Sequence, residues 1–214
     1  MRQISLIVYD FDGTLVDTLF DITDSVNLTL ADLSLPKLPR ETIRKYVGKG
    51  VERLMLQTLE GSSFTDIPQA VALFKKHYSE NLVHHTDFYP HGREILEHFK
   101  NKKQAICSNK PEDFVRRILD SLNRLHSFDL IIGGDSVNSK KPDPEGLISI
   151  LEKLNVSADE AVLIGDSPVD VETGKRAGVY TCVANFGLGF PEEIAIANPD
   201  CSIDCLSKLK EMFC

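Results

Sequence analysis

Short apolar runs alternate with amphipathic stretches along most of the chain. The apolar runs predict strands at residues 4–9, 104–108, 130–133, 161–164 and 180–184. The first run is apolar almost throughout, which is typical of a parallel strand buried on both faces. Helical spacing between the runs predicts helices at residues 93–100, 112–122, 144–154 and 169–177, the last ended by Gly178. Alternating strands and helices predict an α/β fold with a doubly wound parallel sheet.

Residues 17–85 interrupt this alternation. Helical spacing predicts four helices there, at residues 18–34, 40–46, 50–59 and 68–81, and no strand stands out among them. A purely helical block between the first and second strands predicts an inserted all-helical cap domain, residues 17–85. The core domain then consists of residues 1–16 and 86–214, which the chain re-enters through Phe88-Tyr89-Pro90-His91-Gly92.

Composition and net charge argue against nucleic acid and membranes as binding partners. With 24 basic and 32 acidic residues the net charge is 24 − 32 = −8, and an acidic surface repels both nucleic acid and anionic membranes. The apolar start of the chain is too short for a signal peptide or a membrane span. These features predict a cytoplasmic protein, and the sequence leaves monomer and homodimer open. The five cysteines form no CxxC pair, so we expect small buried thiols and no zinc site.

Polar side chains follow the ends of four predicted strands. In a doubly wound sheet the ligand binds at the carboxyl ends of the strands. This rule selects Asp10 and Asp12, Ser108 and Asn109, Gly133 to Asp135, and Gly165 and Asp166. Lys140 and Lys141 follow the third strand after a short loop. An acidic protein with carboxylates and lysines converging in this way is suited to binding a phosphate with the help of a metal.

Two acidic motifs favour a divalent cation. Asp10 and Asp12 lie two residues apart, and close carboxylates are unfavourable unless a cation neutralises them or one is protonated. Mg²⁺ prefers one or two carboxylates together with water and substrate phosphate oxygens. Asp166 and Asp170 supply a second acidic pair. Several of these residues also have a plainer interpretation. Asp166 and Ser108 could each cap the helix that follows, and the lysine pair Lys140 and Lys141 could be solvated surface.

Four segments carry a resemblance to a known family. The segments DFDGTLVDT, SNKP, KKPDPEGL and GDSPVD resemble, in order and spacing, the four motifs of the haloacid dehalogenase superfamily. Within it the chain is most similar to the phosphoglycolate phosphatase group, and its cap position resembles the helical C1 type. The motifs, cap and trailing segments cover nearly the whole chain. One departure is the segment Asn185 to Gly189, where relatives often have a tyrosine.

The resemblance implies roles for individual residues. Asp10 would be the nucleophile that forms an aspartyl-phosphate, and Asp12 the general acid and then the general base. Ser108 and the backbone at Asn109 would hold the phosphoryl oxygens. Lys141 would balance charge on the phosphoryl group and on the nucleophile, with Lys140 as the alternative.

The same resemblance implies a metal site. Mg²⁺ would be bound by the Asp10 carboxylate, the Asp12 carbonyl oxygen and Asp166, with Asp170 steadying the site from nearby. In the cap, Lys49 is a candidate for meeting a substrate carboxylate, and a solvated lysine is an equal alternative. Arg44, Lys45 and Arg53 are lesser candidates for the same contact, with solvated helix faces as their default. The histidines near the cap exit, His84, His85 and His91, are assigned to the surface or a hinge.

The predicted activity is therefore Mg²⁺-dependent hydrolysis of a small phosphate monoester through an aspartyl-phosphate, with 2-phosphoglycolate as the favoured substrate. Alternatives within the superfamily are a sugar phosphomutase, a pyrophosphatase and a nucleotidase. A different class of function, a non-catalytic binding protein on the same scaffold, would be marked by loss of Asp10, Asp12 or Asp166, and all three are present.

Overall fold

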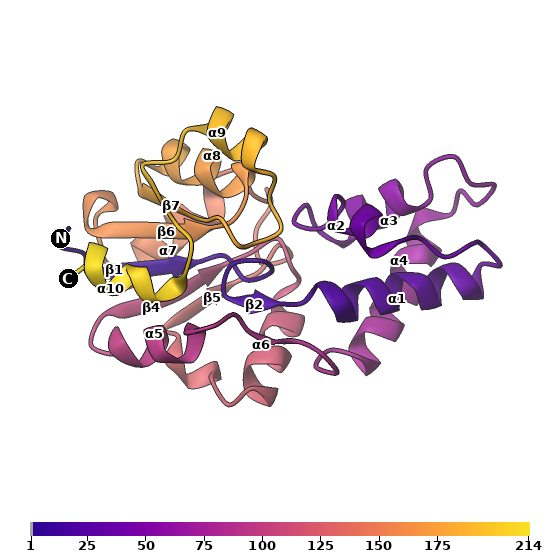
Figure 1. Ribbon diagram of the computed structural model, residues 1–214, viewed down its shortest axis with the longest axis horizontal. Helices are drawn as coiled ribbons and strands as arrows, with labels where there is room; N and C mark the ends of the chain where they lie inside the picture. Colours follow the sequence, from indigo (N-terminus) through magenta and orange to yellow (C-terminus); the bar gives the residue numbers. More distant parts are fainter. Residues whose placement is uncertain (1) are drawn as a thin grey trace.

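Six parallel strands form the central sheet of the computed structural model, which describes residues 2–214 (Figure 1). The strands are β1 Leu6–Tyr9, β4 Lys103–Cys107, β5 Leu130–Ile132, β6 Ala161–Gly165, β7 Tyr180–Ala184 and β8 Cys201–Ile203. Their order in the sheet is β5-β4-β1-β6-β7-β8, so the direction of winding reverses at β1. The five predicted strands are confirmed. The edge strand β8 was not predicted, because three residues are too few for an alternating pattern to stand out.

The register of the central strands brings the strand ends together. Tyr9 of β1 pairs with Ile106 of β4 on one side and with Ile164 of β6 on the other. The residues that follow these three positions therefore lie at the same edge of the sheet. Crevices at such reversal points are the usual ligand sites of open α/β sheets.

Helices cover both faces of the sheet. They are α5 Gly92–His98, α6 Glu112–Ser121, α7 Glu145–Leu154, α8 Pro168–Ala177, α9 Pro191–Ala197 and α10 Leu209–Met212, with short 3₁₀ helices η1 Leu125–Ser127, η2 Ala158–Glu160 and η3 Leu206–Lys208. Because side chains alternate across a strand, Leu6 and Val8 pack with α7 on one face, while Ile7 and Tyr9 pack with α5 and α6 on the other. The four predicted core helices are confirmed; α9 and α10, which are short, were not predicted.

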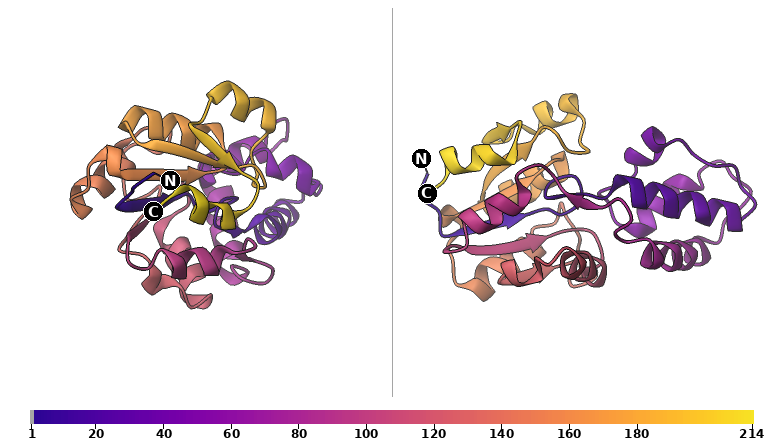
Figure 2. Two further views of the ribbon diagram at one scale, coloured as in Figure 1. Left: turned by 60° about the vertical axis from the view of Figure 1, so that its left-hand side comes forward. Right: turned by 60° about the horizontal axis from the view of Figure 1, so that its bottom comes forward.

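Four helices form a separate layer beyond the carboxyl edge of the sheet (Figure 2). They are α1 Leu19–Asp32, α2 Arg40–Arg44, α3 Val51–Thr58 and α4 Ile67–Glu80. α1 packs against α2 and α4, and α3 packs against α4. Their inward faces bury Val26, Met55 and Phe74 almost completely, and these side chains are continuous with the apolar core on one face of the sheet. The four predicted helices of this segment are confirmed.

A small antiparallel ribbon connects the helical layer to the sheet. Its strands are β2 Val16–Asp17 and β3 Asp87–Phe88, which were not predicted. The predicted cap segment, residues 17–85, begins and ends at this ribbon. Beside it the buried Asp21 of α1 accepts hydrogen bonds from the backbone N–H groups of His85 (3.0 Å) and Thr86 (2.9 Å). The two chain crossings are thereby tied to each other.

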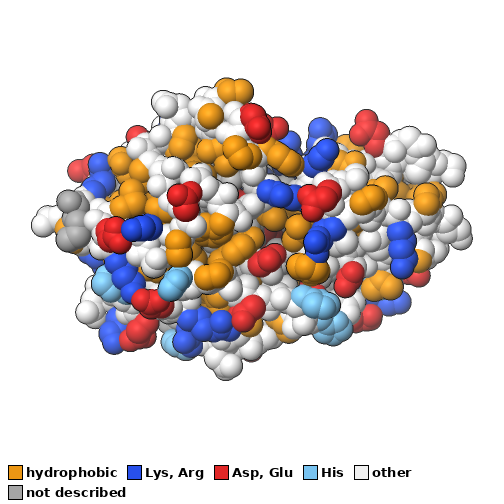
Figure 3. Space-filling model, viewed as in Figure 1, with side chains coloured by type: hydrophobic (Ala, Val, Ile, Leu, Met, Phe, Trp, Pro, Cys, Tyr) orange, Lys and Arg blue, Asp and Glu red, His pale blue; other side chains and the backbone are white. Residues whose placement is uncertain are grey.

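The cysteines and the surface refine the composition-based predictions. All five cysteines are unpaired, but only Cys107 and Cys182 are buried. The expectation of buried thiols is therefore wrong for Cys201, Cys205 and Cys214, which lie in or beyond the edge strand. Within residues 2–214 the helices are all too short or too polar to cross a membrane. Basic and acidic side chains are mixed over the face shown in Figure 3.

Candidate active site

Asp10 lies directly after β1, where the sheet order reverses, and only 7% of the residue is exposed. Lys141 Nζ lies 2.9 Å from Asp10 Oδ1 and donates a hydrogen bond of 2.6 Å to Asp170 Oδ1. Burial raises the pKa of Asp10 to about 6, and the negative charge of Asp170 adds to this while Lys141 opposes it. The ion pair thus keeps a buried carboxylate available at neutral pH.

Lys141 meets this carboxylate and its neighbour Lys140 does not. Burial by itself disfavours the charged ammonium of Lys141, but Asp10 and Asp170 outweigh that effect and raise its pKa. Lys140 is exposed and lines a surface groove between the core and the cap helices. The plainer interpretation of the lysine pair as solvated therefore holds for Lys140 alone.

Asp166 and Asp170 come from the end of β6 and the first turn of α8. Ser167 is the N-cap of α8, and it forms a capping box with Asp170. Asp166 is thus not the helix cap that the plainer interpretation requires. Its carboxylate accepts hydrogen bonds from Thr14 Oγ1 (3.1 Å) and from the backbone N–H of Leu188 (2.6 Å). Burial first, then the charges of Asp170 and Asp10, raise the pKa of Asp166 to about 8.

The carboxylates of Asp10, Asp166 and Asp170 cluster at a place that suits a divalent cation. Asp10 and Asp166 are the candidate ligands, because both oxygens of Asp170 already accept hydrogen bonds from Lys141 and from the start of α8. One carboxylate oxygen from each of Asp10, Asp166 and Asp170 lies within 4.8 Å of the others. Asp10 Oδ1 is buried and, among residues 2–214, receives no hydrogen bond, because Lys141 reaches it only as an ion pair. Clustered carboxylate oxygens are the donor set that Mg²⁺ favours, and its positive charge would lower the raised pKa values of Asp10 and Asp166.

Asp12 points away from this cluster. Its Oδ1 accepts hydrogen bonds from Thr18 Oγ1 (2.6 Å) and from Lys110 Nζ (2.9 Å). Lys110 also donates a 2.7 Å hydrogen bond to the hydroxyl of Tyr78 in α4. Burial, with the charge of Asp12 second, raises the pKa of Tyr78 well above its usual range, so this hydroxyl stays neutral. The contact joins the Asp12 carboxylate to the helical layer.

Ser108 and Asn109 directly follow β4 beside these groups and are both buried. The N-cap of α6 is Pro111, so Ser108 does not have the helix-capping role of the plainer interpretation. Asn109 Nδ2 donates to the carbonyl oxygens of Gly48 in the cap and Lys141 in the core, both at 3.0 Å. The Asn109 side chain therefore positions two loops around the site.

The loop between α2 and α3 covers the site from the cap side. Lys49 is exposed and lines an outer cavity of about 1150 Å³ together with Asp10 and Asp12. Arg44 donates hydrogen bonds from Nε to the carbonyl oxygen of Leu188 (3.1 Å) and from a terminal nitrogen to that of Gly187 (3.2 Å). The segment that departs from the family pattern is thus held by a cap arginine, which had been assigned to the solvated surface.

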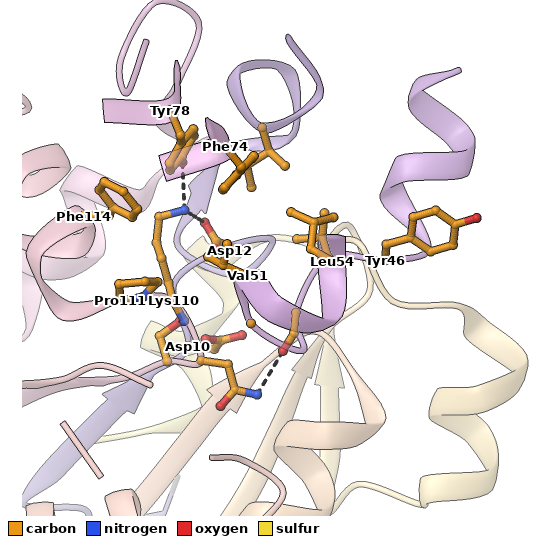
Figure 4. A pocket seen from close by; sticks show the side chains of 16 residues that line it. Asp10, Asp12, Tyr46, Val51, Leu54, Phe74, Tyr78, Lys110, Pro111 and Phe114 are labelled. Atoms are coloured by element: carbon orange, nitrogen blue, oxygen red, sulfur yellow. Dashed lines mark hydrogen bonds and ion pairs between the residues drawn. The ribbon is translucent and has the colours of Figure 1, made fainter. Parts of the chain in front are cut away.

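A second cavity, of about 480 Å³ including space open to solvent, lies between the strand ends and the cap (Figure 4). Its floor contains Asp10, Asp12 and Ser108, and its upper wall consists of apolar and aromatic side chains from α1, α3, α4 and α6. The predicted nucleophile and general acid therefore face the same cavity.

Several residues that build the site were not singled out from the sequence. They are Thr14, Thr18, Gly48, Tyr78 and Lys110. Lys110 lies inside the SNKP motif, which was the only available signal, while Tyr78 is indistinguishable from other apolar positions of an amphipathic helix. Two histidines at the cap exit pair with acidic side chains outside the carboxylate cluster: His85 bonds to Asp21 and His91 to Glu94.

Comparison with known proteins assigns the chain to a family. Residues 7–184 match the family described as haloacid dehalogenase-like hydrolase, and the chain belongs to that family. The chain is 40% identical over 184 residues to phosphoglycolate phosphatase of Aquifex aeolicus, covering 85% of both proteins. It is 36% identical over 212 residues to phosphoglycolate phosphatase of Pseudomonas savastanoi pv. phaseolicola, covering 95% of this chain and 78% of the relative.

A solved structure supports the same assignment. The fold matches the crystal structure of a predicted phosphoglycolate phosphatase from Haemophilus somnus with a TM-score of 0.94 and 27% identity, covering 99% of each chain. The relative arrangement of sheet and helical layer is therefore shared over the full length. The resemblance inferred from the four motifs, and the predicted α/β fold with its inserted helices, are confirmed.

Proposed function

We propose that this protein is a Mg²⁺-dependent phosphatase of small phosphate monoesters, with 2-phosphoglycolate as the favoured substrate. The observation that carries the proposal is the buried Asp10 carboxylate, paired with Lys141 and facing a cavity that also contains Asp12. The names of the relatives support the substrate. No sequence feature of the inactive-scaffold alternative is present, because all the aspartates that the reaction requires are in place.

The reaction proceeds in two displacements. Asp10 attacks phosphorus, the bond from phosphorus to the alcohol oxygen breaks, and Asp12 gives that oxygen a proton. Water then attacks the aspartyl-phosphate, Asp12 accepts the water proton, and phosphate leaves with Asp10 restored. Ser108, the backbone at Asn109, and Lys141 hold the phosphoryl oxygens and offset their charge, which is the main requirement of phosphoryl transfer.

The bound cation would be held by the Asp10 carboxylate, the Asp12 carbonyl oxygen and Asp166. It would supply positive charge against the phosphoryl oxygens. Asp170 steadies the arrangement, because it holds Lys141 through one oxygen and the first turn of α8 through the other.

We assign residues 17–85 to a cap domain that closes over the site, and Lys49 to the mouth of the cavity, where it meets incoming anions. The net charge of −8 supports a small phosphorylated metabolite as partner in preference to nucleic acid or membrane. Unpaired cysteines are consistent with a reducing, cytoplasmic location. Monomer and homodimer both remain compatible with this proposal.

The test is phosphate release from a panel of esters, with Mg²⁺ and with EDTA. The panel contains phosphoglycolate, sugar phosphates, nucleoside monophosphates and pyrophosphate. We expect Mg²⁺-dependent release with phosphoglycolate far ahead of the other compounds. A lead by another ester would keep the mechanism and change the substrate. Folded, metal-loaded protein that releases phosphate from none of them would refute the phosphatase proposal and favour a mutase or a binding protein.

A further inference from the structure

Lys110 is the one cationic side chain among the residues that line the 480 Å³ cavity within residues 2–214. It follows β4, and only 4% of its side chain is exposed. Three neighbouring wall residues, Phe74, Tyr78 and Phe114, are aromatic, and the Lys110 ammonium lies 4.5 Å from the centre of the Tyr78 ring. A cation in such surroundings attracts an anion more strongly than an exposed lysine does, because little water screens it.

The Lys110 ammonium has a donor to spare. Its two hydrogen bonds go to Asp12 Oδ1 and to the Tyr78 hydroxyl, and an ammonium has three N–H donors. In Figure 4 the ammonium lies between these two groups at the edge of the cavity. Lys110 and Thr18 both donate their hydrogen bonds to Oδ1 of Asp12. The other carboxylate oxygen, Oδ2, is therefore available to the leaving oxygen of a substrate.

These positions set a distance relation between the leaving oxygen and Lys110. A leaving oxygen that is hydrogen-bonded to Asp12 lies about 3 Å from that carboxylate, whose other oxygen is in contact with Lys110. In an ester whose alcohol part is glycolate, a carboxylate oxygen lies about 3 Å from the ester oxygen, given bond lengths of about 1.5 Å. These distances allow the substrate carboxylate to reach the Lys110 ammonium while the leaving oxygen stays at Asp12, when the carboxylate turns toward the Lys110 side of Asp12.

We propose that Lys110 is the specificity-determining residue of this site and selects phosphate esters whose alcohol part carries a carboxylate close to the ester oxygen. The proposal rests on the proposed phosphatase function and deepens it. A neutral alcohol part would leave the third N–H donor of Lys110 unpaired beside aromatic side chains. The protein would then bind the transition state of that ester less tightly. Lys49, which is exposed and lines the outer cavity, attracts anions without distinguishing the alcohol part.

The experiment compares two esters in three proteins. Phosphoglycolate and 2-hydroxyethyl phosphate share the phosphoryl group and a primary alcohol oxygen. Phosphoglycolate carries a carboxylate where 2-hydroxyethyl phosphate carries a hydroxymethyl group. We expect the wild-type protein to favour phosphoglycolate by about 10²-fold or more in kcat/KM. Lys110→Met should bring that ratio close to one, and Lys110→Arg should retain part of it. Because Lys110→Met also removes a partner of Asp12, both esters will slow, and the ratio cancels that shared loss.

Each outcome decides between the inference and the broader proposal. A ratio that survives in Lys110→Met, or one that collapses in Lys49→Met instead, overturns the role of Lys110. Equal use of both esters by the wild-type protein overturns the inference and leaves the phosphatase intact. Lys110-dependent preference for a different carboxylate-bearing ester supports the inference and changes the proposed substrate. If Lys110→Met does not fold, Lys110→Gln retains a hydrogen-bond donor without the charge and takes its place in the same comparison.

Discussion

Replacing Lys141 with Met separates the electrostatic role of this residue from its bulk. Methionine is similar in length to the lysine stem, so the change removes the ammonium and leaves only a small packing defect. Asp10 and Asp170 then face each other without their cation in a site where the lysine side chain was 4% exposed. Removing one partner of a buried ion pair costs about 3–5 kcal/mol, because the remaining charge is left uncompensated.

The size of this effect depends on pH and on metal. At pH 7.5 in EDTA we expect a loss of about 3 kcal/mol, which for a chain of this size is roughly a 6–12 °C drop in Tm. At pH 5.5 the loss should be smaller, since protonation of Asp10, whose pKa is already about 6, removes part of the repulsion. Mg²⁺ at 100 times its Kd should restore about 2.7 kcal/mol.

The assays are urea unfolding followed by circular dichroism, with and without Mg²⁺, and steady-state phosphate release. We expect kcat to fall by about 10²- to 10³-fold, the effect of losing one donor to the developing charge. The matched control is Lys140→Met, at the exposed neighbour, which should change stability by less than about 0.5 kcal/mol. Unchanged stability of Lys141→Met in EDTA would refute the electrostatic argument, and loss of turnover in Lys140→Met would transfer the catalytic role to that residue.

Three further predictions concern the same network. Asp10→Asn should retain the fold by circular dichroism and show no measurable turnover, because an amide cannot form the aspartyl-phosphate. Asp21→Ala should lower the free energy of unfolding by about 2–4 kcal/mol in urea titrations, since two backbone N–H groups lose their acceptor. In EDTA, stability should fall as pH rises from about 4 to about 8: the folded-state pKa of Asp166 is about 8 against an ordinary value of 3.8, so the folded protein binds more protons across that window. Asp166→Asn should flatten this slope in thermal melts taken across the same pH range.

Each of these has a clear contrary result. Mg²⁺-dependent activity in pure Asp10→Asn would remove Asp10 as nucleophile. Wild-type stability in Asp21→Ala would mean that the ribbon is held by other contacts. A metal-free protein that becomes more stable between pH 5 and 8, and an equal slope in Asp166→Asn, would contradict the raised pKa of Asp166.

The fold was predictable to the extent that it rests on local patterns. The five runs that became β1, β4, β5, β6 and β7 are apolar over most of their length, because their strands are covered by helices on both faces. The short ribbon of β2 and β3 and the edge strand β8 have two or three residues each, and pairing across the chain, not their own sequence, makes them strands.

Some residues of the candidate site were predictable from the sequence, and others depended on the tertiary structure. Asp10, Asp12, Ser108 and Asp166 were predictable because parallel strands in register place their carboxyl ends at one edge. The preference for Lys141 over Lys140 came from the family resemblance alone, since adjacent lysines look alike in sequence and differ in which one the loop buries.

The sequence by itself determined the order of the main strands and helices, the inserted helical segment and the candidate residues Asp10, Asp12, Ser108 and Asp166. Those features depend on periodicity, on turn residues and on residue type, all of which are local. Only the tertiary structure decided which of these groups meet: Lys110 with Tyr78, 32 positions apart, and Arg44 with Leu188, 144 positions apart. Such contacts depend on how the helical layer sits over the sheet, and no local pattern encodes a distance between residues that only packing brings together.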